Sequence, residues 1–160
     1  MKKTIYIILG LLMFSFYACQ EDVDVEVGKT ATLKMAGQWW LHEYDDAMVE
    51  QDNWLEAYTF NTSENTTDSI WLELHDYDLR VKVAISLSAE TFTATQTEDV
   101  VSGGAYDIAD GKIIRNATTT MGGHTVDSIY FTLNDGTDTY IYAGQRFTGF
   151  PEDDPFTPEQ

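Results

Sequence analysis

The sequence predicts an all-β fold, either a sandwich or a barrel. Residues 30–147 consist of short segments in which apolar and polar residues alternate, with turn residues roughly every ten positions. Thr, Val, Ile and aromatic residues dominate these segments, as they do in pleated, half-buried strands. No stretch after residue 19 keeps the 3.6-residue apolar period of a helix.

Ten candidate strands follow from this pattern. The clearest covers residues 79–87, where Val81, Val83 and Ile85 fall on one face and Arg80 and Lys82 on the other. The full set, in chain order, is 30–35, 39–44, 56–62, 69–75, 79–87, 91–96, 105–108, 112–117, 125–133 and 139–147.

The connections carry their own signals. Asp110-Gly111 and Asp135-Gly136 each separate two strand segments and predict tight hairpin turns. A short helix is expected at 47–54. Residues 66–74 resemble residues 125–133, which indicates either equivalent strands on opposite walls of a barrel or chance convergence of two core strands.

The N-terminus predicts export. Lys2 and Lys3 precede a thirteen-residue apolar run, 5–17, which is too short for a comfortable membrane span and is typical of a signal peptide covering residues 1–18. Ala18 precedes Cys19, the only cysteine, in an arrangement that resembles a bacterial lipobox. We therefore expect lipidation of Cys19 and attachment to a membrane through acyl chains.

The segments on either side of the barrel domain differ from it in composition. Residues 19–28 form an acidic tether, which resembles the export signal of Bacteroidetes lipoproteins exposed on the outer membrane; a plain solvated tether is the alternative. Residues 151–160 hold all three prolines and predict a disordered acidic tail. The folded domain is therefore expected at 29–150.

Composition excludes several classes of function. The chain has 27 acidic against 9 basic residues and a formal net charge of −18, which argues against nucleic-acid binding. A single cysteine excludes a disulfide framework and a cysteine-built metal centre. Asp and Asn clusters at 76–78 and 134–138 lack the spacing of a calcium loop and are interpreted as turns, so no metal or cofactor is predicted.

Gly37-Gln38-Trp39 opens a strand and resembles the lipocalin-type signature, in which Trp plugs one end of the barrel and an Arg from a late strand lies across it. Arg146 is the candidate partner of Trp39. With the signal peptide, lipobox, acidic leader and length, residues 19–150 resemble the Bacteroidetes family of lipid-binding putative hydrolases. The resemblance implies a lipocalin-like antiparallel β-barrel of about eight to ten strands.

Such a barrel has room for side chains or one small apolar or lipidic ligand. The candidates to line a cavity are aromatic, and each could instead fill the core: Trp40, Tyr58, Phe60, Trp71, Phe92, Tyr130, Phe131, Tyr140 and Tyr142. We expect a non-catalytic binding protein. The alternatives are a structural or interaction subunit of an outer-membrane uptake complex, with a membrane protein as partner, and a lipid or ester hydrolase.

No residue is assigned a catalytic role. The hydrolase signatures Gly-x-Ser-x-Gly and His-Glu-x-x-His are absent, and we interpret His42, His75 and His124 as exposed or strand-end residues. Ser69 and Ser128 each follow an aspartate and precede an isoleucine, a pattern that resembles an O-glycosylation motif of exported Bacteroidetes proteins.

Overall fold

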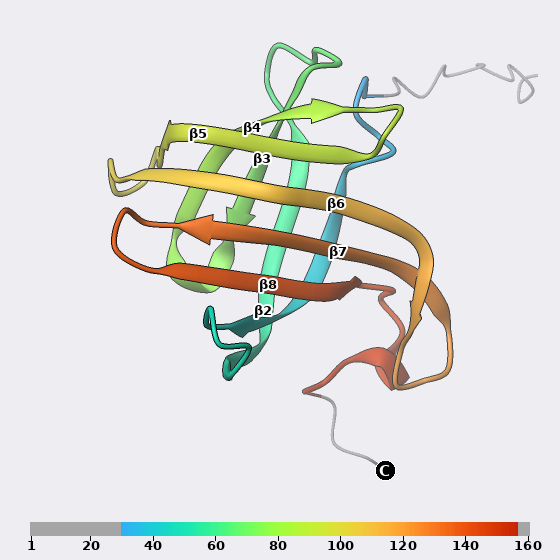
Figure 1. The fold of residues 1–160 in the computed structure, drawn as a ribbon. Helices are drawn as coiled ribbons and strands as arrows, with labels where there is room; N and C mark the ends of the chain where they lie inside the picture. Colours follow the sequence, from blue (N-terminus) through green and yellow to red (C-terminus); the bar gives the residue numbers. More distant parts are fainter. Residues whose placement is uncertain (1–29, 157–160) are drawn as a thin grey trace, which may run out of the picture.

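The computed structural model describes residues 30–156, and these form a closed antiparallel barrel (Figure 1). Each strand pairs with the next in the chain, and β8 pairs with β1 to complete the closure. The strands are β1 (Gly37–Tyr44), β2 (Glu50–Asn61), β3 (Ser69–Leu74), β4 (Leu79–Ser86), β5 (Thr91–Glu98), β6 (Ala105–Thr119), β7 (Thr125–Asn134) and β8 (Thr139–Arg146). Two 3₁₀ turns, η1 (His75–Tyr77) and η2 (Pro151–Asp153), are the only helical elements among the described residues. The predicted all-β barrel is confirmed.

The barrel has eight strands because two of the ten expected segments behave differently. Residues 31–35 form turns, with the Met35 N–H donating to the Thr32 carbonyl at 2.8 Å. The segments 105–108 and 112–117 belong to one long strand, β6, because Asp110-Gly111 is a bulge and not a hairpin. Asp110 takes the positive φ of 54° that such a dipeptide allows, yet the strand continues, since β5 and β7 flank it on both sides.

Two other local predictions had different outcomes. Asp135-Gly136 does form the turn between β7 and β8, with Gly136 at a φ of 91°. The helix expected at 47–54 is absent from the structure. There, Asp45 Oδ1 accepts hydrogen bonds from the N–H groups of Ala47 and Val49, and the chain turns directly into β2. An aspartate that bonds the backbone two and four residues on stabilises a turn in competition with a helix.

Apolar side chains fill most of the barrel interior. They come from alternate positions of all eight strands, as the two-residue period of a strand requires. β3 and β7, which carry the internal sequence repeat, are four strands apart in the closed order and therefore form opposite walls. The residues of this core are Met35, Trp39, Leu41, Leu55, Ala57, Ile70, Leu72, Leu74, Leu79, Val81, Val83, Phe92, Ile108, Ile113, Ile129, Phe131, Leu133 and Tyr142.

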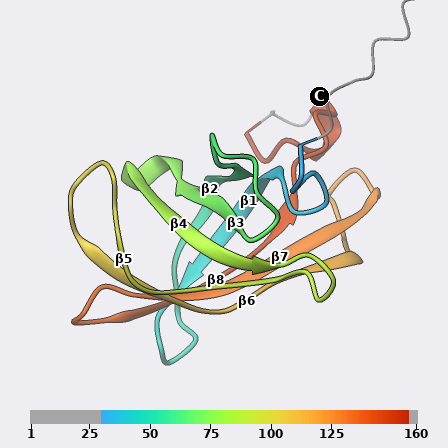
Figure 2. The same ribbon diagram turned by 90° about the horizontal axis from the view of Figure 1, so that it is seen from above.

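The two ends of the barrel differ. The segment before β1, the β6–β7 hairpin and the C-terminal segment lie at one end, towards the right of Figure 1, and we call it the closed end. The β5–β6 and β7–β8 loops lie at the other end, together with the β1–β2 and β3–β4 connections, and we call it the mouth. Figure 2 gives the same arrangement from above.

Trp39 closes the first of these ends. Its indole N–H donates to Thr59 Oγ1 at 2.9 Å, and the Thr59 hydroxyl donates to the Met35 carbonyl at 2.6 Å. The Arg146 guanidinium lies over the indole, 5.3 Å from the ring centroid, and also donates to the Ala36 carbonyl. A Cβ on Gly37 would come within 2.9 Å of the guanidinium, so glycine at this position permits the close approach.

The C-terminal segment differs from the disordered tail expected from residue 151. Asp153, with 3% of its surface exposed, accepts hydrogen bonds from the Gly122 N–H at 3.0 Å and from the Thr148 hydroxyl at 2.6 Å. Its other carboxylate contact is His124 Nδ1 at 2.9 Å. These contacts attach η2 to the β6–β7 hairpin, because a buried carboxylate needs several donors. Residues 157–160 lie outside the described part of the chain.

Candidate functional site

The mouth of the barrel contains a cavity of about 260 Å³, which we call the mouth cavity. Leucines and tyrosines form most of its wall, and two carboxylates complete it. The lining residues are Glu43, Leu74, Tyr77, Leu79, Tyr106, Leu133, Asp135, Tyr140 and Tyr142.

Strand parity places a carboxylate inside this end of the barrel. Trp39, Leu41 and Glu43 occupy alternate positions of β1 and are all buried, so Glu43 is the last inward residue before the β1–β2 turn. Only 7% of its surface is exposed. The Tyr142 hydroxyl, from the neighbouring strand β8, donates to Glu43 Oε2 at 2.6 Å.

Two tyrosines around Glu43 are held in the protonated form. Burial raises the pKa of Tyr142, and its hydrogen bond to Glu43 raises that pKa further. Burial also raises the pKa of Tyr77, which comes from η1, and a hydrogen bond with Glu43 adds to the shift. Both phenols therefore stay protonated across the physiological pH range, and the Tyr142 hydroxyl remains a hydrogen-bond donor to Glu43.

The cavity is shallow because aromatic packing fills the barrel beneath it. The Tyr142 ring stacks on Phe131 at 4.9 Å between centroids, and Phe131 contacts Phe92 at 5.8 Å. Pockets that hold a whole drug-sized ligand span roughly 300–1,000 Å³. The mouth cavity is just below that range, so its size suits a head group or a short chain with the remainder of the molecule outside.

The nine aromatic candidates divide between the inside and the outside of the barrel. Phe92, Phe131 and Tyr142 are core residues, and Tyr140 lines the mouth cavity. The other five occupy the alternate, outward positions of their strands: Trp40, Tyr58, Phe60, Trp71 and Tyr130. Position along the strand separates the two groups. Each of the five has a buried neighbour in its strand that points inward, so its own side chain points outward.

Seven lining residues were not among the sequence candidates: Glu43, Leu74, Tyr77, Leu79, Tyr106, Leu133 and Asp135. Glu43 is in phase with Trp39 and Leu41, so it follows as an inward carboxylate once Trp39 is known to lie inside the barrel. Tyr77 and Tyr106 carry no comparable signal. Tyr77 belongs to a turn, and Tyr106 is the second residue of β6, just after the loop at 99–104. Only the folded chain directs these two side chains to the cavity.

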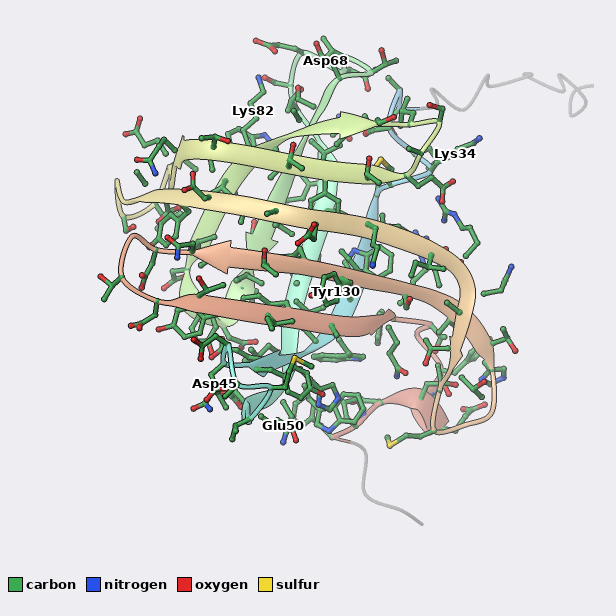
Figure 3. The ribbon with its side chains drawn as sticks, in the orientation of Figure 1. Lys34, Asp45, Glu50, Asp68, Lys82 and Tyr130 are labelled. Carbon is green, nitrogen blue, oxygen red and sulfur yellow. The ribbon has the colours of Figure 1, made fainter. Side chains whose placement is uncertain are left out.

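A second hollow, of about 480 Å³, lies on the outer wall of the barrel, and we call it the outer groove. Trp40, Trp54 and Tyr130 contribute aromatic surface to it, and Figure 3 labels Tyr130 on β7. Lys112 Nζ lies 4.7 Å from the Tyr130 ring centroid. Phe147 and Phe156 pack edge-on against Trp40, with centroids at 6.0 and 5.4 Å.

The three histidines pair with carboxylates. His42 Nδ1 lies 2.6 Å from Glu50, and His75 Nδ1 lies 3.4 Å from Glu73. His124 contacts Asp153, as described above. Within residues 30–156, no histidine ring nitrogen is hydrogen-bonded to a serine or threonine hydroxyl.

The remaining sequence candidates fall in different places. Ser69 is buried at the start of β3 and donates to Asp68 at 3.2 Å. Ser128 lines the outer groove. Cys19, the signal peptide and the acidic tether lie outside the described residues, and glycosylation and lipidation stay predictions.

No helix within residues 30–156 is long and apolar enough to span a membrane. In the same segment, no group of three or more His, Cys, Asp or Glu side chains is arranged to hold a metal ion.

A closed eight-stranded barrel with a small cavity at one end is the architecture of proteins that hold a small ligand. Residues 24–151 match the family described as lipid-binding putative hydrolases, and the chain belongs to this family, as its sequence predicted. A search of curated proteins finds no match to this chain.

Proposed function

We propose that this protein binds a small apolar or lipidic molecule at the mouth cavity, without catalysing a reaction on it, while a lipid on Cys19 anchors it to the outer membrane. The observation that carries the proposal is the mouth cavity itself. Its leucine and tyrosine wall offers apolar contact, and the mouth is where a ligand can enter an otherwise filled barrel. Membership of a lipid-binding family supports the same assignment.

A filling substitution tests the site. Leu79→Phe adds bulk to the cavity wall, whereas Ala84→Phe adds bulk to an exposed position on the outer face of the same strand. We expect the purified protein to bind the neutral apolar probe N-phenyl-1-naphthylamine and to retain lysolipids at one-to-one stoichiometry in native mass spectrometry. Leu79→Phe should weaken both and Ala84→Phe should weaken neither. Equal binding by both variants would place the ligand elsewhere.

The non-catalytic part of the proposal rests on the three histidines, whose ring nitrogens contact carboxylates and not hydroxyls. A hydrolase needs a base within hydrogen-bond reach of its nucleophile. Lysolipid recovered after prolonged incubation should be chemically unchanged. Release of fatty acid at a rate proportional to protein concentration would favour the hydrolase alternative.

The anchor has a separate test. An alkyne-labelled fatty acid should be incorporated into the full chain in cells and should not label Cys19→Ser, which should leave the membrane fraction. Exposure on the cell surface predicts that protease added to intact cells degrades the protein. Replacing Glu21, Asp22 and Asp24 with alanine should then protect it, if the acidic run directs export.

The outer groove favours the second candidate function, an interaction subunit of an outer-membrane complex. Its aromatic surface lies on the wall of the barrel, away from the mouth cavity. In this case Trp54→Ala would abolish co-purification with a membrane protein and would leave binding of the naphthylamine probe unchanged.

A further inference from the structure

We propose that the mouth cavity selects ligands that carry an organic ammonium group and rejects those that carry a carboxylate. This inference rests on the proposed function, because it names the chemistry of the ligand that the same cavity binds. Three features of the cavity support it: a buried carboxylate without a cation, a ring of tyrosines, and a second carboxylate at the rim.

The first feature is Glu43. It is 7% exposed, and the Tyr142 hydroxyl donates to it at 2.6 Å. In the part of the chain that the structure describes, no Lys, Arg or His forms an ion pair with it. A carboxylate withdrawn from water without a cation is unfavourable, so a ligand that brings a positive charge into the cavity compensates it.

The second feature is the aromatic wall. Tyr77, Tyr106, Tyr140 and Tyr142 come from η1, β6 and β8 and surround one small space. The face of a tyrosine ring attracts a cation, and several such faces around one point form the cage that proteins use for quaternary ammonium groups. Leucines alone would complete an apolar cavity for a neutral chain, whereas tyrosines and a carboxylate together suit a cation with methyl or methylene groups.

The third feature is the charge at the rim. Asp135 lines the cavity, and its Oδ1 accepts hydrogen bonds from the N–H groups of Thr137 and Asp138, both at 2.8 Å. These bonds lower the pKa of Asp135 and keep it ionised. A fatty-acid carboxylate entering the cavity would meet two negative charges, while the net charge of −18 attracts cations from solution.

The volume limits which part of the ligand is enclosed. If each non-hydrogen atom takes about the 30 Å³ of a water molecule, the cavity of about 260 Å³ holds roughly eight to nine atoms. A trimethylammonium group with a short stem fits within this limit. The group could belong to a lipid head group or to a small free amine, and the chemistry recognised is the same.

Three ligands with one six-carbon chain isolate the charge: hexyltrimethylammonium, hexanol and hexanoate. Titration calorimetry on the purified protein should give at least tenfold tighter binding for the ammonium than for hexanol, with hexanoate the weakest. Glu43→Gln keeps an acceptor for Tyr142 and should lower the affinity for the ammonium at least tenfold while changing that for hexanol less than threefold. The matched control is Glu98→Gln, which removes one exposed charge from β5 and should change neither affinity more than twofold.

The outcomes separate this inference from the proposed function. Hexanol bound as tightly as the ammonium, or hexanoate bound more tightly, overturns the charge selectivity and leaves the binding site in place. Binding of none of the three, with no binding of N-phenyl-1-naphthylamine, overturns both. If Glu43→Gln does not fold, Tyr106→Leu replaces it: loss of the ring should weaken the ammonium and spare hexanol, and equal weakening of the two contradicts the cage.

Two further ligands distinguish the sources of the ammonium. Free choline that binds within threefold of hexyltrimethylammonium indicates a small free amine. Dihexanoylphosphatidylcholine that binds at least tenfold tighter than free choline indicates a lipid head group. If neither binds while hexanol does, the ammonium inference is wrong.

Discussion

Replacing Thr59 by valine should destabilise the closed end and lower the free energy of unfolding of the protein. Thr59 is 2% exposed, and its hydroxyl links the buried Trp39 indole to the Met35 carbonyl. Valine has nearly the same shape, so the change removes two hydrogen bonds and leaves one donor and one acceptor buried. Each unsatisfied group costs about 1–3 kcal/mol. Burial of the new methyl group offsets about 0.8 kcal/mol, so the expected loss is about 3 kcal/mol.

Urea denaturation of the purified protein, followed by circular dichroism, measures this loss as a change in the free energy of unfolding. Thr93→Val is the matched control, because Thr93 is exposed on β5 and the same change there should stay within about 0.5 kcal/mol. A loss for Thr59→Val no greater than that of the control would refute the reasoning. Water would then have to satisfy the indole and the carbonyl, and the closed end would be hydrated.

Three further predictions concern the same scaffold. Although burial opposes its ionisation, hydrogen bonds from Thr120, Thr148, His124 and the Gly122 N–H lower the pKa of Asp153 from 3.8 to about 2. The ionised Asp153 should therefore make its full contribution to the free energy of unfolding above about pH 4, and this contribution should be lost as the pH falls towards 2. Wild type and Asp153→Asn should differ more in the midpoint of urea denaturation at pH 6 than at pH 2.5. A difference that does not change with pH contradicts this. Gly144→Ala places a Cβ 2.0 Å from the Trp40 carbonyl and should lower the free energy of unfolding by about 3 kcal/mol. In the control Gly103→Ala the Cβ meets no atom within 4 Å, and the loss should be about 1 kcal/mol. A lower melting temperature for Gly103→Ala than for Gly144→Ala would be inconsistent with the packing. Arg146→Lys loses the planar group over Trp39 and should cost about 1–2 kcal/mol, and an unchanged melting temperature would show that the stacking contributes nothing.

The strands of the barrel could be predicted because their signal is local. Alternation along β4 places Val81 and Val83 on one face, and the structure buries both. The turn at Asp135-Gly136 follows in the same way, since a glycine at positive φ between two strands closes a hairpin.

The same local signals failed where neighbouring strands decide the outcome. Asp110-Gly111 has the sequence of a turn, but pairing with β5 and β7 on either side makes it a bulge within β6. A Cβ on Gly111 would lie 2.3 Å from the Phe92 carbonyl, so this glycine allows a close approach between strands and not a reversal. The sequence of the Pro-rich C-terminal segment predicts disorder for a related reason. The residue that pairs with its Asp153 is His124, which lies 29 residues earlier in the chain, so no local pattern reveals the contact.

The sequence by itself determined the all-β class and the family to which the chain belongs. It also determined which side chains of a strand share a face. For β1, only the tertiary structure decided which parity faces inward. Trp39 and Trp40 are adjacent and equally apolar, yet closure of the barrel places one in the core and the other on the outer wall. The two-residue period relates neighbours within a strand but carries no reference to the barrel axis. The mouth cavity depends on the same closure, which brings Glu43 of the first strand beside Tyr142 of the last.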